Sequence, residues 1–208
     1  MKALSYLLAI LLVPAVILLS FRLLIFNKPF YLQQFEKVGT YQKLDKNVAD
    51  FQTNNLINYM CCTENIDTNF YNQTEIAHLK DVKVLVRLAN NHLNLHIVFL
   101  TVIASILIFR KRFDLLAFGT HLASTVGIAA ILILAISSLL NFPFLFEKFH
   151  VISFNNDLWL LPADANLIKL FPQQFFQNFA NRIALQAIAI FLILILISRF
   201  IKNDCKVR

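Results

Sequence analysis

Four long apolar stretches alternate with polar ones along the chain. The two clearest cover residues 3–26 and 115–140, and each holds the roughly 18 or more mostly apolar residues that a helix needs to cross a bilayer. Two shorter stretches cover residues 93–109 and 183–197, so we expect less apolar helical turns to lengthen them at their outer ends. The pattern predicts an all-α membrane protein with four transmembrane helices.

Two polar segments, residues 27–92 and 141–182, would then lie on the outer side of the membrane. The first is rich in Asn and Gln and carries spaced aromatic residues, as is typical of short amphipathic helices at a membrane surface. The second carries nine Phe, the single Trp and three Pro, which we expect to divide it into short pieces. We therefore predict an extracytoplasmic cap of short amphipathic helices, within one domain that covers residues 1–208.

Charges beside the helix ends predict the orientation. With four spans, one side holds eight basic and two acidic residues, whereas the other side holds equal numbers of each. Because cytoplasmic loops carry an excess of Lys and Arg, both termini should lie in the cytoplasm. These positions account for the pI of about 9.5, so we expect no nucleic-acid partner. The charged residues of the cytoplasmic side are Lys2, Arg110, Lys111, Arg112, Asp114, Arg199, Lys202, Asp204, Lys206 and Arg208.

The first stretch is too long for a signal peptide, and no small-residue cleavage pattern follows it, so it should be an uncleaved anchor. The three cysteines give little indication of a disulfide framework or of a catalytic thiol. Cys61 and Cys62 are neighbours, between which a disulfide would be strained, and Cys205 lies on the opposite side of the membrane. We expect none of them to be catalytic.

Two of the five histidines lie in the outer segments with carboxylates nearby. Around His78, Glu75 and Asp81 each stand three residues away, which makes them neighbours on a helix surface where either could orient the imidazole and raise its basicity. His150 belongs to a polar cluster that interrupts an apolar segment. Polar groups close to a membrane are usually either hydrogen-bonded or functional. The alternative for each is an interfacial histidine bonded to a neighbour.

The other histidines fit structural roles. His92 and His96 lie at the outer end of the second span, and His121 lies in the cytoplasmic half of the third span, where an imidazole bonded to a facing helix is the expectation. A metal site is not predicted, because the chain has no His-Glu-x-x-His and no cysteine pair with ligand spacing. We expect no cofactor.

Four motifs follow one another along the outer segments: Glu75-x-x-His78-x-x-Asp81-Val82, Phe149-His150-x-x-x-Phe154-x-x-Asp157-x-Trp159, Asp164-x-x-Leu167-Ile168 and Pro172-x-x-Phe175-Phe176. The chain with these motifs resembles a family of small bacterial membrane proteins that includes the lipoprotein intramolecular transacylases. The resemblance covers nearly the whole chain. One departure is that Leu161 precedes Pro162, where a carboxylate would be expected in a typical member.

The resemblance implies an acyltransferase of the bacterial plasma membrane, with membrane lipids and a diacylated lipoprotein as its partners. It would move the sn-2 acyl chain of the lipoprotein onto the α-amine of the N-terminal cysteine. His78 and His150 would be the general acid and base at the outer face, with the two roles unassigned. The supporting residues would be Glu75, Asp81, Asp157 and Trp159, with the two aspartates holding the tautomers of the histidines.

Two other hypotheses stay open at this point: a non-enzymatic lipid-binding or assembly protein of the same fold, and a hydrolase acting on similar lipids. The enzyme hypotheses require the two imidazoles, which are far apart along the chain, to converge at the outer membrane face.

Overall fold

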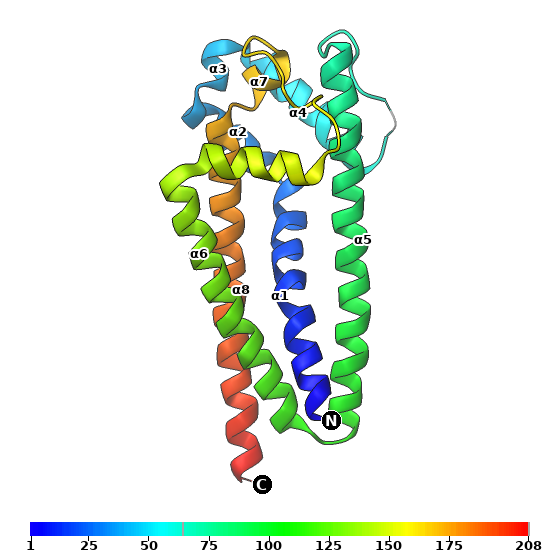
Figure 1. Ribbon diagram of the computed structural model, residues 1–208, viewed down its shortest axis with the longest axis vertical. Helices are drawn as coiled ribbons and strands as arrows, with labels where there is room; N and C mark the ends of the chain where they lie inside the picture. Colours follow the sequence, from blue (N-terminus) through cyan, green and yellow to red (C-terminus); the bar gives the residue numbers. More distant parts are fainter. Residues whose placement is uncertain (64, 208) are drawn as a thin grey trace. The chain divides into compact units, whose positions relative to one another are not determined.

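The computed structural model describes the backbone of residues 1–63 and 65–207, and side chains in these ranges as far as residue 202 (Figure 1). Every regular element in these ranges is a helix, which confirms the all-α class. The charges and the cysteine noted above at residues 204–206 and 208 lie outside the described side chains. The helices are α1 (Lys2–Ile25), α2 (Lys28–Val38), α3 (Thr40–Lys43), α4 (Lys46–Cys61), α5 (Gln73–Phe109), α6 (Phe113–Ser153), α7 (Asn166–Leu170) and α8 (Gln173–Val207).

Four of these helices, α1, α5, α6 and α8, are long and apolar enough to cross a membrane, as predicted. The two short apolar stretches lie inside longer helices, since α5 begins at Gln73 and α8 begins at Gln173. The first turns of α5 carry five charged residues, from Glu75 to Arg87, which disfavour their placement in hydrocarbon, so residues 93–109 stay the predicted span.

Packing divides the chain into two compact units. The bundle unit comprises Met1–Arg22, Asn90–Ile136 and Arg182–Arg208, and the polar unit comprises Leu23–Ala89 and Ser137–Asn181. Each of the four long helices contributes to both units. The expectation of one domain stays a prediction.

The bundle unit is held together by small apolar clusters between its helices. Leu8 of α1 packs with Leu107 of α5 and Leu115 of α6, and Val16 of α1 packs with Ile131 of α6 and Phe191 of α8. Gly127 allows the second contact, because a Cβ there would lie 2.4 Å from the ring of Phe191. Many other Leu, Ile, Val and Phe side chains of these helices are exposed, as expected for surfaces that face lipid.

The three structural histidines belong to the bundle unit. His121 Nδ1 lies 3.4 Å from Ser198 Oγ on α8, so its imidazole contacts a facing helix, as predicted. His96 Nδ1 lies 2.7 Å from the carbonyl oxygen of His92, one turn earlier on α5. These contacts give His96 a partner on its own helix and His121 a partner on a facing helix.

The polar unit contains the short helices α2, α3, α4 and α7, which confirms the predicted short helical pieces. Its core is aromatic: the ring centroid of Phe35 on α2 lies 5.7 Å from that of Phe171 and 6.0 Å from that of Phe175 on α8. Thr40 Oγ1 donates to the carbonyl oxygen of Leu170 at the end of α7, 3.1 Å away. These contacts fix α2 and α3 against the segment that joins α7 to α8.

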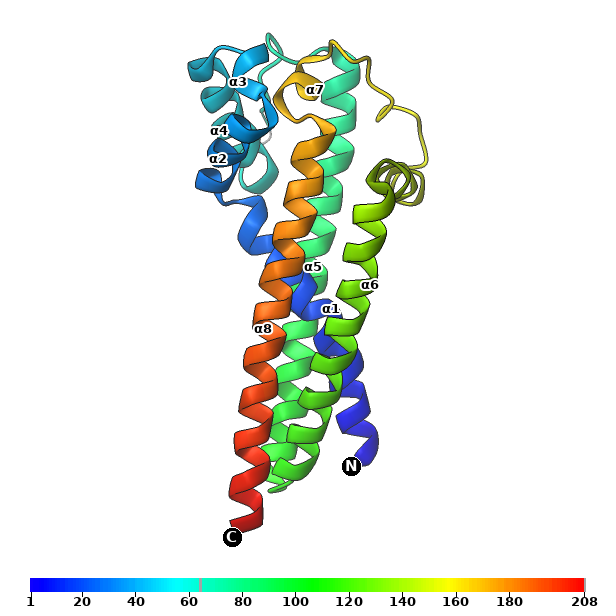
Figure 2. The ribbon, with the colours of Figure 1, turned by 90° about the vertical axis from the view of Figure 1, so that its left-hand side faces the viewer.

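Helix α6 is interrupted at Asn141, whose backbone leaves the helical region at φ −157° and ψ 75° (Figure 2). The Asn141 side chain then accepts a hydrogen bond from Phe144 N, 3.1 Å away, and so caps the helix that restarts. Pro143 stands in the first turn of this second part, where a proline is tolerated because its missing N–H would have no partner. The third predicted span ends at this break, and the restarted helix carries His150.

The two neighbouring cysteines are joined. Despite the strain expected between neighbours, Cys61 and Cys62 form a disulfide, with Cα atoms 3.7 Å apart. Helix α4 ends at Cys61, and Cys62 already has a non-helical backbone at φ −138° and ψ −30°. This departure from the helix lets the two side chains face each other.

Candidate active site

The polar unit brings His78 and His150 together from two different helices. His78 lies near the start of α5, and His150 lies in the part of α6 that follows Asn141. The centroids of the two rings are 6.1 Å apart, and both side chains are buried. The expected convergence of these imidazoles is therefore present.

Aromatic side chains surround the imidazole pair. The centroid of Phe154 lies 5.2 Å from that of His78 and 5.7 Å from that of His150. On His150, Phe146 approaches to 4.3 Å and Trp159 to 5.0 Å, the latter with its ring tilted by only 32°. Walls of this kind exclude water and offer apolar surface to hydrocarbon chains.

A backbone hydrogen bond fixes the proton of His150. Its Nδ1 atom lies 2.6 Å from the carbonyl oxygen of Phe146, one helical turn earlier. A carbonyl oxygen only accepts, so Nδ1 carries the hydrogen in the neutral ring and Nε2 keeps a free lone pair. His150 is thereby prepared to take up a proton at Nε2.

Both imidazoles favour the neutral form. The pKa of His78 is lowered to about 4, mainly by burial and also by the nearby His150, while Asp81 partly opposes the shift. Burial also lowers the pKa of His150, partly opposed by its hydrogen bond to Phe146. The expected rise in the basicity of His78 is therefore not observed, because desolvation outweighs the carboxylate nearby.

Glu75 contacts backbone groups instead of His78. Its carboxylate accepts from Asn72 N at 2.7 Å, and the Asn72 side chain accepts in return from Glu75 N at 2.9 Å, which is a capping box at the start of α5. The second carboxylate oxygen accepts from Leu167 N of α7, also at 2.7 Å. Glu75 therefore connects α5 to α7, and His78 Nδ1 is left without a hydrogen-bond partner among the described residues.

Asp81 also has a partner other than His78. One of its carboxylate oxygens accepts from Asn156 Nδ2 at 2.9 Å, which ties the segment after α6 to α5. Asp157 is exposed and shows no side-chain hydrogen bond within the described residues. The proposed holding of tautomers by Asp81 and Asp157 is thus not seen, and the partner of His150 Nδ1 is the Phe146 carbonyl.

Asn156, which donates to Asp81, lies three residues before Trp159, whose ring contacts that of His150. We expect Asn156→Ala to release this segment, shift the emission of the single tryptophan to longer wavelength and increase its quenching by acrylamide. Asn155→Ala, at the exposed preceding residue, is the matched control and should leave the emission unchanged. Equal spectra for both variants would show that the hydrogen bond does not hold Trp159 in place.

Two contacts of the site were missed by reasoning from the sequence. The Phe146 carbonyl stands four residues before His150, so a helical spacing over 142–153 would have placed it within reach. Asn156 gave no comparable signal, because its partner Asp81 lies 75 residues away along the chain.

The arrangement suits proton transfer. Two neutral imidazoles face each other in a water-poor enclosure, and one of them has a defined basic nitrogen. Among the residues that the structure describes, no group of three or more His, Cys, Asp or Glu side chains is placed to hold a metal ion.

Comparison with known proteins identifies relatives of this fold. The membrane-integral lipoprotein intramolecular transacylase Lit from Bacillus cereus is 17% identical, with a TM-score of 0.85 over 100% of this chain and 98% of that chain. Two variants of that protein also match at 17% identity. The variant with a histidine replaced by alanine gives 0.83 over 100% and 96% of the two chains, and the variant with arginine gives 0.82 over 99% and 93%.

At this identity the solved structures establish the fold. No curated protein sequence matches the chain. The model of one family, described as lipoprotein intramolecular transacylase Lit, matches residues 6–176, which is most of the chain and includes both His78 and His150. The chain therefore belongs to the lipoprotein intramolecular transacylase family.

Proposed function

We propose that the chain is a lipoprotein intramolecular transacylase that moves the sn-2 acyl chain of a diacylglyceryl-modified lipoprotein onto the α-amine of its N-terminal cysteine. The product is a lyso-form lipoprotein. The observation that carries this proposal is the approach of two neutral imidazoles to 6.1 Å inside an aromatic enclosure, in a chain of this family.

His150 is the general base of this proposal. The substrate α-amine has an unperturbed pKa of about 7.7 to 8.0, so its ammonium form first releases one proton to solvent, and the neutral amine attacks. As the amine nitrogen bonds to the ester carbonyl carbon, His150 Nε2 accepts a second proton from that nitrogen, because Nδ1 is already committed to the Phe146 carbonyl. The bond from the carbonyl carbon to the glyceryl oxygen then breaks. Protonated His150 gives its proton to the departing oxygen, and the amide nitrogen keeps one hydrogen.

His78 stabilises the intermediate in this scheme. It remains neutral because of its low pKa, so it offers one ring N–H to the carbonyl oxygen as negative charge develops there. The rings of Phe146, Phe154 and Trp159 hold the acyl chain and exclude the water that would otherwise hydrolyse the ester. Because ester and amine belong to one molecule, bringing them together supplies several kcal/mol through proximity.

The site lies on the outer face of the membrane in this proposal. The excess of basic residues on the side that holds Arg110, Lys111 and Arg112 supports placing both termini in the cytoplasm. The polar unit, with both histidines, would then face outward, where the N-terminal cysteine of a lipoprotein is found.

The test is to express the chain in a host whose lipoproteins keep a diacylglyceryl cysteine with a free amine. Fragmentation of the N-terminal lipopeptides in a mass spectrometer should then locate one acyl chain on nitrogen and one on the glyceryl group, at unchanged total mass. Lipopeptides that all keep a free amine would refute the transfer. Loss of one acyl chain with the amine unblocked would instead identify a hydrolase.

The pH dependence of turnover follows from the low pKa values. Because burial lowers the pKa of both imidazoles below the ordinary value of about 6.5, protonation should remove activity only at a lower pH than that. We expect the rate at saturating lipopeptide in detergent micelles to fall with decreasing pH, with a midpoint below 6.5. A midpoint at or above 6.5 would contradict the assignment of a buried histidine as the base.

A further inference from the structure

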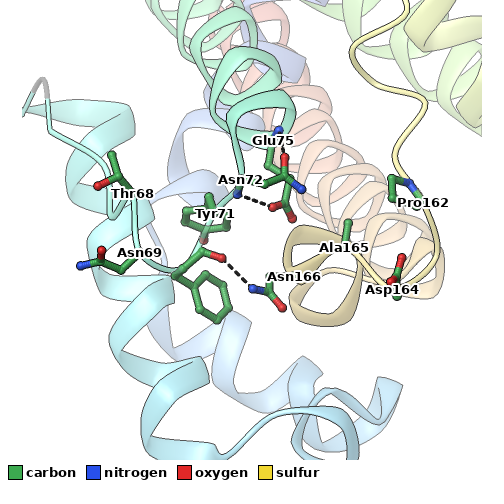
Figure 3. Close-up of a pocket in the computed structure, with 10 residues that line it drawn as sticks. Thr68, Asn69, Tyr71, Asn72, Glu75, Pro162, Asp164, Ala165 and Asn166 are labelled. Carbon is green, nitrogen blue, oxygen red and sulfur yellow. Dashed lines mark hydrogen bonds between the residues drawn. The ribbon is translucent and has the colours of Figure 1, made fainter.

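A second polar feature of the polar unit is a cavity of about 390 Å³ beside the start of α5 (Figure 3). It is lined by residues 68–72 and Glu75 on one side and by residues 162 and 164–166 on the other. Its volume falls within the roughly 300 to 1,000 Å³ of typical ligand sites. The mechanism above does not use it.

Hydrogen bonds hold the two walls in place. Asn166 Nδ2 donates to the carbonyl oxygen of Phe70 across 2.6 Å, from one wall to the other (Figure 3). Glu75 joins the same walls, because its carboxylate binds Asn72 N on one side and Leu167 N beside the other. The cavity is therefore preformed, which lowers the cost of ordering it around a ligand.

Other lining groups are available to a ligand. The side chains of Thr68, Asn69 and Asp164 are exposed, and the structure shows no hydrogen bond to any of them from another described residue. They offer a hydroxyl, an amide and a carboxylate, which together both donate and accept. None of the lining residues is Lys, Arg or His, which disfavours a phosphate, and the polar lining disfavours an acyl chain.

Each wall of the cavity is close along the chain to a residue of the imidazole site. Glu75 stands three residues before His78 on α5, a rise of about 4.5 Å along the helix. Pro162 stands three residues after Trp159, whose ring contacts that of His150. A chain that leaves the imidazole pair can therefore enter the cavity within a few residues.

We propose that this cavity binds the main chain of the lipoprotein just after its modified cysteine. This inference rests on the proposed function, which places the α-amine of that cysteine at His150. The polypeptide that follows carries one N–H and one C=O per residue, and these groups match the hydroxyl, amide and carboxylate of the lining. The acyl chains stay with the aromatic walls, so the two parts of the substrate separate by polarity.

The first test compares two synthetic substrates with the full-length protein in nanodiscs. One is a diacylglyceryl cysteine followed by five residues, and the other ends in a methylamide directly after the cysteine. We expect Thr68→Trp, which fills the cavity without removing a hydrogen bond, to lower the ratio of kcat/KM for the long substrate to that for the short one about tenfold. Asn54→Trp, which adds the same bulk on the exposed surface of α4, is the matched control and should keep the ratio.

A wild-type protein that treats both substrates alike, or a Thr68→Trp variant that keeps the wild-type ratio, would overturn the inference. The second test needs no turnover. The long substrate is made with an sn-2 ether in place of the ester and with benzoylphenylalanine directly after the cysteine, and cross-links are mapped by mass spectrometry. We expect them within residues 68–72 or 162–166, and cross-links confined to other residues would refute the site.

The two tests separate the inference from the proposed function. If the ester substrates are not converted while the ether analogue cross-links to the cavity lining, the chemistry fails and the peptide site stands. If the esters are converted and the cross-links lie elsewhere, the function stands and the peptide site falls.

Discussion

Replacing His150 with alanine should lower turnover by about 10² to 10⁴, the range that removal of a general acid or base typically costs. The physical reason is that Nε2 of this residue is the nitrogen whose lone pair is defined, because Nδ1 donates to the Phe146 carbonyl. The measurement is the rate of N-acyl product formation from a diacylglyceryl lipopeptide, with purified protein in nanodiscs.

A second substitution distinguishes the hydrogen bond that His150 makes to Phe146 from the basicity of its ring. His150→Asn keeps an N–H close to the position of Nδ1, so it can still donate to Phe146, but it has no basic nitrogen. We expect a loss similar to that of the alanine variant. His96→Ala is the control, since this histidine belongs to the bundle unit and contacts only the His92 carbonyl among the hydrogen bonds described. Activity of His150→Asn near that of the wild type would remove His150 from the role of base.

The largest expected effect on stability comes from Glu75→Ala. This carboxylate is 1% exposed and accepts from two backbone N–H groups, one at the start of α5 and one in α7. Its removal leaves the buried Leu167 N–H without a partner and opens the capping box. We expect a loss of about 2 to 4 kcal/mol in the free energy of unfolding, from the cost of two bonds to a charged acceptor.

The measurement is the thermal midpoint of the solubilised protein, followed by the fluorescence of Trp159. Glu75→Gln should fall between the wild type and the alanine variant, because an amide keeps one acceptor oxygen and points an N–H₂ group at the other donor. Asp157→Asn changes an exposed carboxylate and should leave the midpoint unchanged. A Glu75→Ala variant as stable as the wild type would show that water replaces the carboxylate at both N–H groups.

The carboxylates show where local reasoning from sequence ends. Glu75 and Asp81 both stand three residues from His78, so helical spacing made them candidate partners of its ring. Spacing limits which residues are near but does not decide which group each oxygen binds. Leu167 N and Asn156 Nδ2, which approach from other segments, take those oxygens. The ring of His78 then lies among aromatic groups, and burial lowers its pKa.

The motif residues show where such reasoning succeeded. His150, Phe154 and Trp159 were named from one short pattern, and the structure places all three rings within 6 Å of another ring of the site. The Phe146 carbonyl was missed, although a restarted helix after Asn141 would have placed it one turn from His150. That second helix was not predicted because Asn141 and Pro143 are typical of the end of a helix.

The order of apolar and polar residues by itself determined that this chain crosses a membrane four times, because a helix must present about 20 apolar residues to the hydrocarbon whatever its neighbours are. It also predicted that His78 and His150 lie outside the spans. Only the tertiary structure decided that His78 and His150 meet, which nitrogen of His150 carries the hydrogen, and that Glu75 connects helices. These features depend on hydrogen bonds and ring contacts whose directions are set by packing, and residue spacing alone does not specify them.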